Sequence, residues 1–289
     1  MIVRQHEKVL VQGITGKQGT FWTQRMQEYG TTIMGGVNPK KAGTTHCDVP
    51  VFANAREAMR EDGFDVSVLF IPPLGCREAA LDAIEAGCKK LVILTEHIPV
   101  QDVMIIMAAA RAHGAQILGP NTAGQVTPGE CFVGFMPAFE ADIFQPGRIG
   151  VISRSGSLGT LICLNVVQAG FGESAFIGIG GDPVIGTTTK DALSTLNEDS
   201  NTDAIVMVGE IGGSMEEEAA ELAATMNKPV IAFIAGGASP PGKKMGHAGA
   251  IVSGGTGTAE EKMTALRDAG AQVARHPDEI AEMVAKNIS

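Results

Sequence analysis

Two residues in the second half of the sequence have the chemistry for phosphoryl transfer. Glu210 stands at the end of an apolar run, and His247 lies in a loop of glycine and alanine, where packing gives an imidazole little to do. A histidine in a phosphate-binding environment can act as a nucleophile, and a carboxylate can orient its ring. The alternative interpretations are a surface-loop histidine and a buried structural acid.

Four glycine-rich loops accompany these residues. They read SRSGSLG at 153–159, GIGGDP at 178–183, VGEIGG at 208–213 and KKMGHAG at 243–249. Open α/β sheets bind ligands at the carboxyl ends of their strands, where these loops are expected. The hydroxyls and N–H groups of the first loop could hold a phosphoryl group. The segment GASPPGKK at 237–244 resembles an NTPase phosphate loop, but Lys244 replaces the Mg²⁺-binding hydroxyl, and Pro240 and Pro241 lack N–H donors. We predict no NTP site there.

A second candidate site lies near the start of the chain. The segment GITGKQG at 13–19 follows a predicted strand and opens a helix, so its N–H groups could bind phosphate. A glycine-rich turn that only packs helix on sheet is the alternative. The next strand runs into Asn38-Pro39-Lys40-Lys41 without the carboxylate that NAD requires. The two lysines suit a phosphorylated ribose, as in NADP or coenzyme A, or are solvated loop charges.

Alternating strands and helices must position these loops. Apolar, β-branched runs predict strands at 8–12, 31–37, 66–71, 91–95 and 116–118, and again at 148–152, 175–179, 204–208, 229–234 and 272–274. Amphipathic segments predict helices between them, for example over 77–86 and 100–113. Ser214 with Glu217 and Thr258 with Glu261 fit capping boxes. The pattern predicts two doubly wound α/β domains, at 1–122 and 148–289, joined by a linker at 123–147.

Composition narrows the function classes. The chain has 289 residues and a net charge of −10, which argues against a general nucleic-acid binder. No apolar run reaches the ~18 residues that a membrane span needs, and the N-terminal run leaves no room for a signal peptide. The five cysteines are scattered without a C-x-x-C pair. We therefore expect a cytoplasmic protein without a metal site.

Taken together, the motifs resemble the α subunit family of succinyl-CoA synthetase. They appear in order as QGITGKQGTF, GGVNPKKAGTTH, ILTEHIP, ILGPNTAG, GVISRSGSLG, GIGGDPVIG, MVGEIGG and KKMGHAGAIVSGGTGTAEEK. The resemblance implies a Rossmann-like CoA-binding domain followed by a flavodoxin-like ligase domain. In that family a histidine is phosphorylated, the phosphoryl group passes to a carboxylic acid, and CoA attacks the acyl phosphate.

Residue roles follow from the matching motifs. His247 would be the phosphohistidine and Glu210 its orienting partner, with Ser153, Ser155 and Gly156 around the phosphoryl group. The residues implied to bind coenzyme A are Thr15, Gly16, Lys17, Gln18, Lys41 (near the 3′-phosphate), Leu94, Thr95 and Glu96. Mg²⁺ and ATP or GTP would bind a separate ATP-grasp β subunit, in an αβ or α2β2 assembly.

Two departures from the family pattern bear on the substrate. Thr122 replaces a cysteine close to the CoA thiol, and Thr160 replaces a tyrosine beside the acid. Succinate is the first expectation among small dicarboxylic acids, and malate–CoA ligase or a citryl-CoA synthetase-type subunit is the nearest alternative. A non-catalytic CoA-binding regulatory module and an NADP-dependent oxidoreductase are the rivals from other classes.

Overall fold

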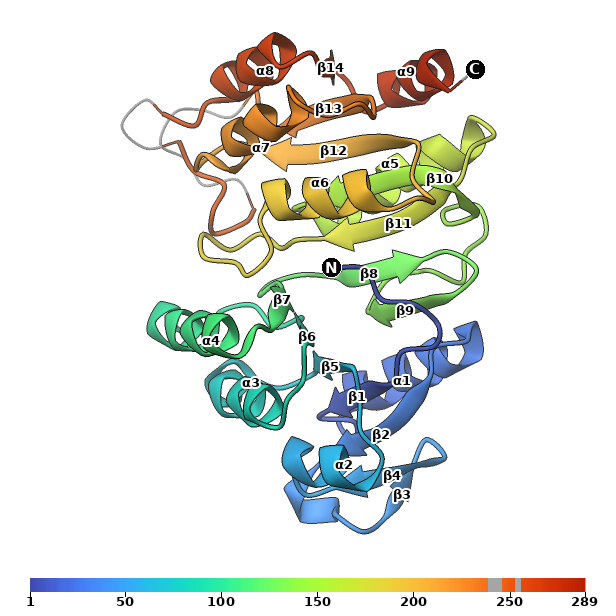
Figure 1. Cartoon of the computed structure of the whole chain (residues 1–289), viewed down its shortest axis with the longest axis vertical. Coiled ribbons are helices and arrows are strands. Elements are labelled where there is room, and N and C mark those ends of the chain that lie inside the picture. The colour runs from blue at the N-terminus through green and yellow to red at the C-terminus, as the bar shows by residue number, and fades with distance from the viewer. Residues whose placement is uncertain (239–245, 253–255, 289) are drawn as a thin grey trace.

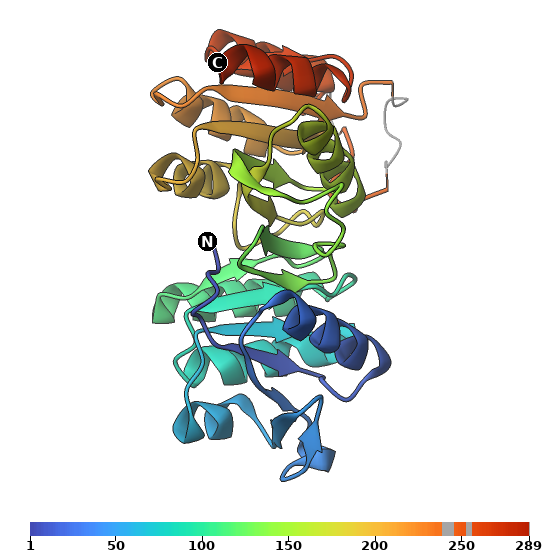
Figure 2. The same cartoon turned by 90° about the vertical axis from the view of Figure 1, so that its right-hand side faces the viewer.

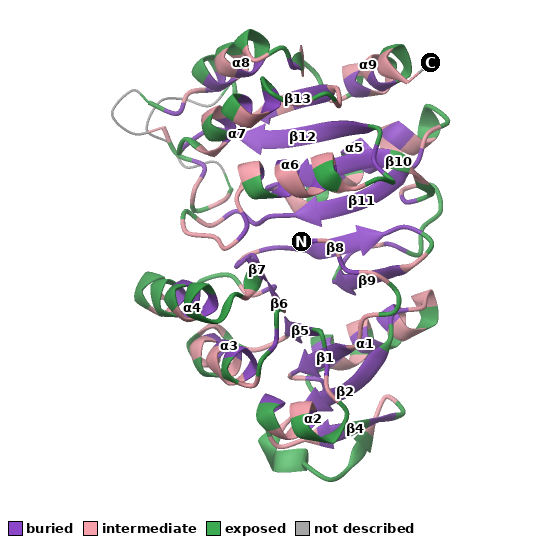
Figure 3. Cartoon of the chain, in the orientation of Figure 1, coloured by how far each residue is buried: buried purple, intermediate pink, exposed green. Residues whose placement is uncertain are grey.

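The computed structural model describes residues 1–238, 246–252 and 256–288. Within these residues the strands form two seven-stranded sheets, one in each half of the elongated molecule (Figure 1). Helices flank each sheet, as the perpendicular view in Figure 2 shows. The strands are almost wholly buried, whereas the helices expose their outer faces (Figure 3). This pattern confirms the α/β prediction.

The first sheet has the order β3-β4-β2-β1-β5-β6-β7, and its pairs are parallel except for β3 with β4. Its strands are β1 (Val9–Gln12), β2 (Ile33–Val37), β3 (Thr45–His46), β4 (Val49–Phe52), β5 (Val66–Leu69), β6 (Lys90–Ile93) and β7 (Gln116–Leu118). The helices are α1 (Lys17–Tyr29), η1 (Pro39–Lys41), α2 (Ala55–Glu61), η2 (Pro73–Gly75), α3 (Cys76–Glu85) and α4 (Val100–His113). The strand order reverses between β1 and β5, which is where a doubly wound sheet binds its ligand.

The second sheet has the order β14-β13-β12-β10-β11-β8-β9. Its strands are β8 (Gly124–Thr127), β9 (Cys131–Gly134), β10 (Pro146–Ser153), β11 (Glu173–Gly178), β12 (Ala204–Glu210), β13 (Val230–Ala235) and β14 (Gln272–Ala274). The helices are α5 (Gly156–Gln168), α6 (Thr189–Glu198), α7 (Met215–Ala223), α8 (Ala259–Asp268) and α9 (Glu279–Asn287). From β10 onward the strands are parallel in the flavodoxin-like order, which reverses between β10 and β12.

The structure differs from the predicted linker at residues 123–147. This stretch contains β8 and β9, which form an antiparallel hairpin, and β8 pairs with β11 of the second sheet. The prediction missed them because each strand has only four residues and no helix separates them. The hairpin also packs on the first domain, since the Phe132 ring makes edge contacts with Trp22 and Tyr29 of α1.

One hydrophobic core therefore crosses the domain boundary. It runs from β1 and α1 of the first sheet through β8 and β9 into the strands of the second sheet. The N-terminal segment lies beside β8 (Figure 1), where the Thr127 hydroxyl donates to the Val3 carbonyl at 2.8 Å. A second core cluster fills the other face of the first sheet under α2, α3 and α4. The two domains thus share buried contacts rather than a flexible joint.

One of the two predicted capping boxes is present in the structure. Thr258 and Glu261 form the predicted capping box at α8. Ser214 does not cap α7, because its hydroxyl donates to Glu218 and Glu217 instead pairs with Lys262. No helix among the described residues is long and apolar enough to cross a membrane.

Candidate functional site

The two residues proposed for phosphoryl transfer are in contact. Glu210 ends β12, and its Oε2 lies 2.8 Å from Nδ1 of His247. An ionised carboxylate only accepts hydrogen bonds, so the proton of this contact is on Nδ1, and in the neutral ring Nε2 keeps its lone pair. The side chain of Glu210 is only 9% exposed, whereas that of His247 is 27% exposed. The buried Glu210 carboxylate therefore orients the imidazole from the protein interior, and the rest of the ring is partly accessible to solvent.

The charges around His247 favour its protonated form. The hydrogen bond to Glu210 is the largest cause of a raised imidazole pKa, and burial opposes it. Asp182 raises the pKa further, and the Arg154 guanidinium lowers it. An environment that stabilises a positive ring also stabilises the ring after its Nε2 has formed a bond to phosphorus.

One glycine of the 178–183 loop makes room for the imidazole. A Cβ at Gly181 would lie 2.4 Å from Cγ of His247, closer than any side chain allows. The Gly181 carbonyl also accepts the N–H of Gly249 at 3.0 Å, so this loop supports the histidine loop directly. Gly181 therefore allows the close approach of the histidine ring to this loop.

The predicted phosphate loop forms the start of α5. The Ser155 hydroxyl caps this helix by accepting the N–H of Leu158 at 3.3 Å, and Gly156 is its first residue. Ser153 is fully buried, and its hydroxyl donates to the Ser155 carbonyl at 2.7 Å. The Ser153 hydroxyl shapes the loop, whereas the N–H groups at the helix start remain suited to an anion. Phosphate binding by these three residues stays a prediction.

A cavity of about 780 Å³ unites half of the residues predicted to bind coenzyme A. Gln18 of α1 and Leu94, Thr95 and Glu96 after β6 all line it. The cavity adjoins the end of β5, at the reversal point of the first sheet. The Thr95 hydroxyl is already occupied, because it donates to the Ile71 carbonyl at 2.6 Å.

The remaining predicted residues lie outside the cavity lining. Thr15 accepts a hydrogen bond from the Asn38 amide, Gly16 caps α1, and Lys17 begins that helix. Lys41 ends the short helix η1 that follows β2. The Thr15–Asn38 bond joins the loops after β1 and β2, which places the lysine-bearing segment next to the glycine loop. These residues remain candidates for the phosphorylated ribose.

The structure adds residues that the sequence prediction did not single out. Trp22, Asn121 and Phe135 also line the cavity. The Asn121 N–H donates to the Thr95 carbonyl at 3.0 Å, its side chain donates to Asp182 at 2.9 Å, and its carbonyl accepts from Gly181 at 3.1 Å. Asn121 therefore connects the cavity with the loop beside His247. The signal in the sequence is the ILGPNTAG motif, in which Asn121 directly precedes Thr122.

The two threonines that depart from the family pattern are both hydrogen-bonded. The Thr122 hydroxyl donates to the Gly178 carbonyl and accepts the N–H of Gly124 at 2.9 Å. The Thr160 hydroxyl donates to the Gly156 carbonyl at 2.8 Å within α5. Both side chains thus satisfy backbone groups.

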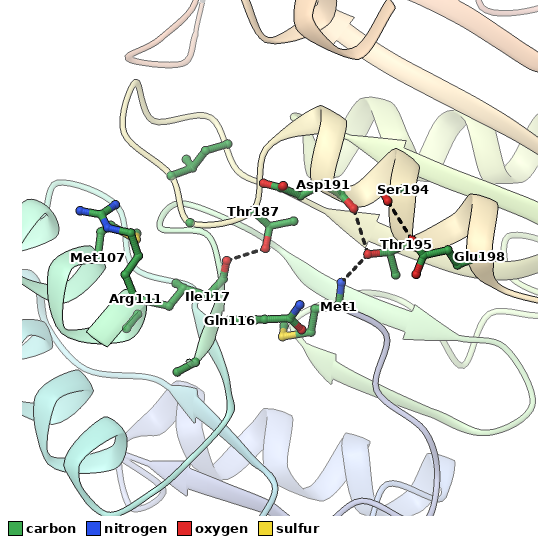
Figure 4. A pocket seen from close by; sticks show the side chains of 14 residues that line it. Met1, Met107, Arg111, Gln116, Ile117, Thr187, Asp191, Ser194, Thr195 and Glu198 are labelled. Atoms are coloured by element: carbon green, nitrogen blue, oxygen red, sulfur yellow. Dashed lines mark hydrogen bonds between the residues drawn. The ribbon is translucent and has the colours of Figure 1, made fainter. Parts of the chain in front are cut away.

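Other features lie apart from this chemistry. A cavity of about 570 Å³ between α4 and α6 contains none of the predicted site residues (Figure 4). Within the described ranges no cluster of three or more His, Cys, Asp or Glu side chains could hold a metal ion. Pro240, Pro241 and Lys244, on which the rejection of an NTP loop rested, lie outside the described residues.

Family models define the class of protein to which this fold and site correspond. Residues 4–97 match the CoA binding domain, and residues 152–272 match the CoA-ligase domain. The succinate–CoA ligase [ADP-forming] subunit alpha 2 of Archaeoglobus fulgidus is 47% identical over 286 residues and covers 99% of each chain. The corresponding α subunit of Aquifex aeolicus is 46% identical over 289 residues, 99% of this chain and 94% of that one. The chain belongs to the family of succinate–CoA ligase α subunits.

A solved structure supports the same assignment of fold. ATP citrate lyase from Methanothrix soehngenii, in complex with citrate and coenzyme A, is 26% identical with a TM-score of 0.87. The match covers 99% of this chain and 50% of that one. The fold predicted from the family resemblance, a CoA-binding domain followed by a ligase domain, is thereby confirmed.

Proposed function

We propose that this chain is the α subunit of an NDP-forming acid–CoA ligase that works through a phosphohistidine at residue 247. The observation that carries this proposal is the 2.8 Å contact between His247 Nδ1 and Glu210 Oε2, at the reversal point of the second sheet. The contact leaves Nε2 as the nucleophile. The start of α5 follows Arg154, whose guanidinium contacts Glu210, and the N–H groups there suit a phosphoryl group.

Phosphoryl transfer to His247 requires no proton to be lost from the His247–Glu210 pair. The Nε2 lone pair forms a bond to phosphorus, the bond to the departing oxygen breaks with its electron pair, and the proton stays on Nδ1, hydrogen-bonded to Glu210. The positive ring is then stabilised by the Glu210 carboxylate. In the second transfer an oxygen of the carboxylic acid attacks phosphorus, and the P–N electron pair returns to Nε2. Coenzyme A, when bound, supplies the thiol that displaces phosphate from the acyl group.

The substrates and partner follow from the relatives. They are named as α subunits of ADP-forming succinate–CoA ligases, so we propose succinate, ATP and a β subunit of ATP-grasp fold that holds the nucleotide and Mg²⁺. GTP and an αβ or α2β2 assembly remain part of the same hypothesis. The match to ATP citrate lyase, together with Thr160, keeps malate and citrate-like acids as the second candidates. None of the five cysteines, all of which lie in the described residues, forms a disulfide. This supports a reducing, cytoplasmic location.

Phosphorylation of the chain tests this function. The complex with its β partner is incubated with Mg²⁺ and ATP or GTP, and we expect a phosphate that is acid-labile and alkali-stable. The variant His247→Asn should lose it, whereas His276→Asn, at an exposed histidine of the same domain, should keep it. A phosphate that persists in His247→Asn would contradict the proposal. CoA binding without phosphate from either nucleotide would favour the non-catalytic regulatory module.

A further inference from the structure

A row of buried charges continues from Glu210 into the protein. Arg154, directly after β10, has its Nε 3.2 Å from Glu210 Oε1 and its Nη1 3.7 Å from Glu216 Oε1. Glu216, in the first turn of α7, has its Oε2 2.6 Å from the Lys262 ammonium of α8. From His247 inward the charges thus alternate in sign, and they come from β12, α7, α8 and two loops.

These side chains are almost completely removed from solvent. The side chain of Arg154 is 2% exposed, and those of Glu216 and Lys262 are not exposed at all. A buried ion pair gains little stability over apolar residues of the same volume, because both charges lose their hydration. A contribution to folding stability alone therefore does not explain why these buried charges lie next to His247.

Arg154 is the residue that joins the row to the histidine. Its guanidinium contacts both carboxylates, and its Nη2 lies against the histidine loop, where a Cβ at Gly249 would be 2.6 Å away. A planar guanidinium has donors on several sides and can engage two carboxylates at once, which a lysine cannot do with fixed geometry. The guanidinium thus faces Glu210 Oε1 as an ion pair without hydrogen-bond geometry, on the opposite carboxylate oxygen from the one that contacts the imidazole.

Hydrogen bonds hold the other end of the row, at Lys262, in place. Lys262 donates to Glu216, to Glu217 at 2.8 Å and to the Gly213 carbonyl at 2.9 Å. Glu216 also accepts the N–H of Glu210 at 3.3 Å, which ties it to the end of β12. The position of Arg154 is thus determined by the packing of α7 and α8 on the sheet.

We propose that Arg154 is a positioning residue for phosphoryl transfer: it holds the Glu210 carboxylate so that the imidazole of His247 keeps its proton on Nδ1 and presents an unprotonated Nε2. This inference rests on the proposed function for its role in catalysis. Its structural part, control of the imidazole tautomer, can be measured on the unphosphorylated protein.

The test combines a spectroscopic and a kinetic measurement on the variants Arg154→Met and Arg154→Lys. Nitrogen-15 spectra of the full chain with labelled histidine rings, assigned with His247→Asn, report which nitrogen carries the proton. Single-turnover phosphorylation by Mg²⁺–ATP is measured in the complex with the β partner. Arg148→Met is the matched control, because it removes an exposed, ion-paired arginine from the opposite end of the same strand.

The wild-type chain and Arg148→Met should show the Nδ1–H tautomer at neutral to alkaline pH. Arg154→Met should shift the ring toward the Nε2–H tautomer and slow phosphorylation by about 10–100-fold, as expected when the group that orients a histidine partner is lost. Arg154→Lys should be intermediate in both measurements. CoA binding, measured in parallel, reports whether each variant is folded.

The proposal is overturned if folded Arg154→Met keeps the wild-type tautomer and rate. If that variant does not fold, Arg154→Lys decides, and a wild-type tautomer and rate in it would equally overturn the proposal. A wild-type complex that never becomes phosphorylated would instead remove the proposed function. In that case the tautomer measurement still tests the contact between Arg154 and Glu210.

Discussion

Glu173 offers a quantitative test of the structure far from the phosphoryl-transfer site. This residue begins β11 and is 1% exposed. Burial raises the pKa of its carboxyl from 4.5 to about 8, although a hydrogen bond from the Gln145 N–H at 3.1 Å and one from the Cys163 thiol work in the opposite direction. The folded protein therefore keeps Glu173 protonated at neutral pH, whereas the unfolded chain releases the proton.

The sign of the pH dependence follows from this difference. The contribution of Glu173 to stability is complete below the unfolded pKa near 4.5 and is lost as the pH rises to about 8. At about 1.4 kcal/mol per pKa unit, the full loss is about 5 kcal/mol. Between pH 6 and pH 8.5 the loss is about 2–3 kcal/mol by the same relation.

Glu173→Gln removes the ionisation while its amide oxygen can still accept from Gln145. The stability of the variant relative to wild type should therefore increase by about 2–3 kcal/mol from pH 6 to pH 8.5. Urea unfolding of the full chain, followed by circular dichroism at both pH values, measures this difference. Glu140→Gln, at an exposed glutamate, should show no such change. An equal effect of Glu173→Gln at both pH values would refute the reasoning.

Three further predictions concern the two sites. Gly181→Ala should slow phosphorylation more than tenfold and leave CoA binding intact, since its Cβ would meet the His247 ring at 2.4 Å; a normal single-turnover rate would contradict this. Lys41→Ala should weaken binding of coenzyme A by about tenfold, because a charge-assisted hydrogen bond to the 3′-phosphate contributes about 1.5–3 kcal/mol. Binding of 3′-dephospho-CoA should not change, and calorimetry with both ligands measures the difference. Thr160→Tyr should change the ratio of kcat/KM for succinate to that for malate or citrate, and an unchanged ratio would remove Thr160 from the acid site.

The positions of most parallel strands along the chain and of the glycine loops could be predicted from local patterns. Apolar runs that end in glycine repeat along the chain and predict two α/β domains, and the family resemblance supplied the type of each domain. The contact between Glu210 and His247, 37 residues apart, was predicted because one ends an apolar run, the other lies in a glycine loop, and the family resemblance pairs the two. Local sequence and family motifs were together sufficient for these features.

The features that the sequence prediction missed depend on contacts between distant elements. Arg154 and Glu216 look like ordinary surface charges in the sequence, and only the packing of β10, β12, α7 and α8 shows that they are buried together. Ser214 fits a capping pattern but bonds to Glu218, because Lys262 draws the expected partner away. Burial and competition between partners are properties of the fold, which a local motif does not contain.

The β8–β9 hairpin limits how this chain can be recombined with its relatives. A chimaera joined at residue 122 would transplant α1 without the Phe132 ring that Trp22 and Tyr29 contact. The aromatic contacts between α1 and the hairpin would then be formed by residues from two different parents. A crossover that takes α1 and the hairpin from the same parent preserves these aromatic contacts. The segment to be exchanged therefore extends beyond the matched CoA-binding domain and includes the hairpin.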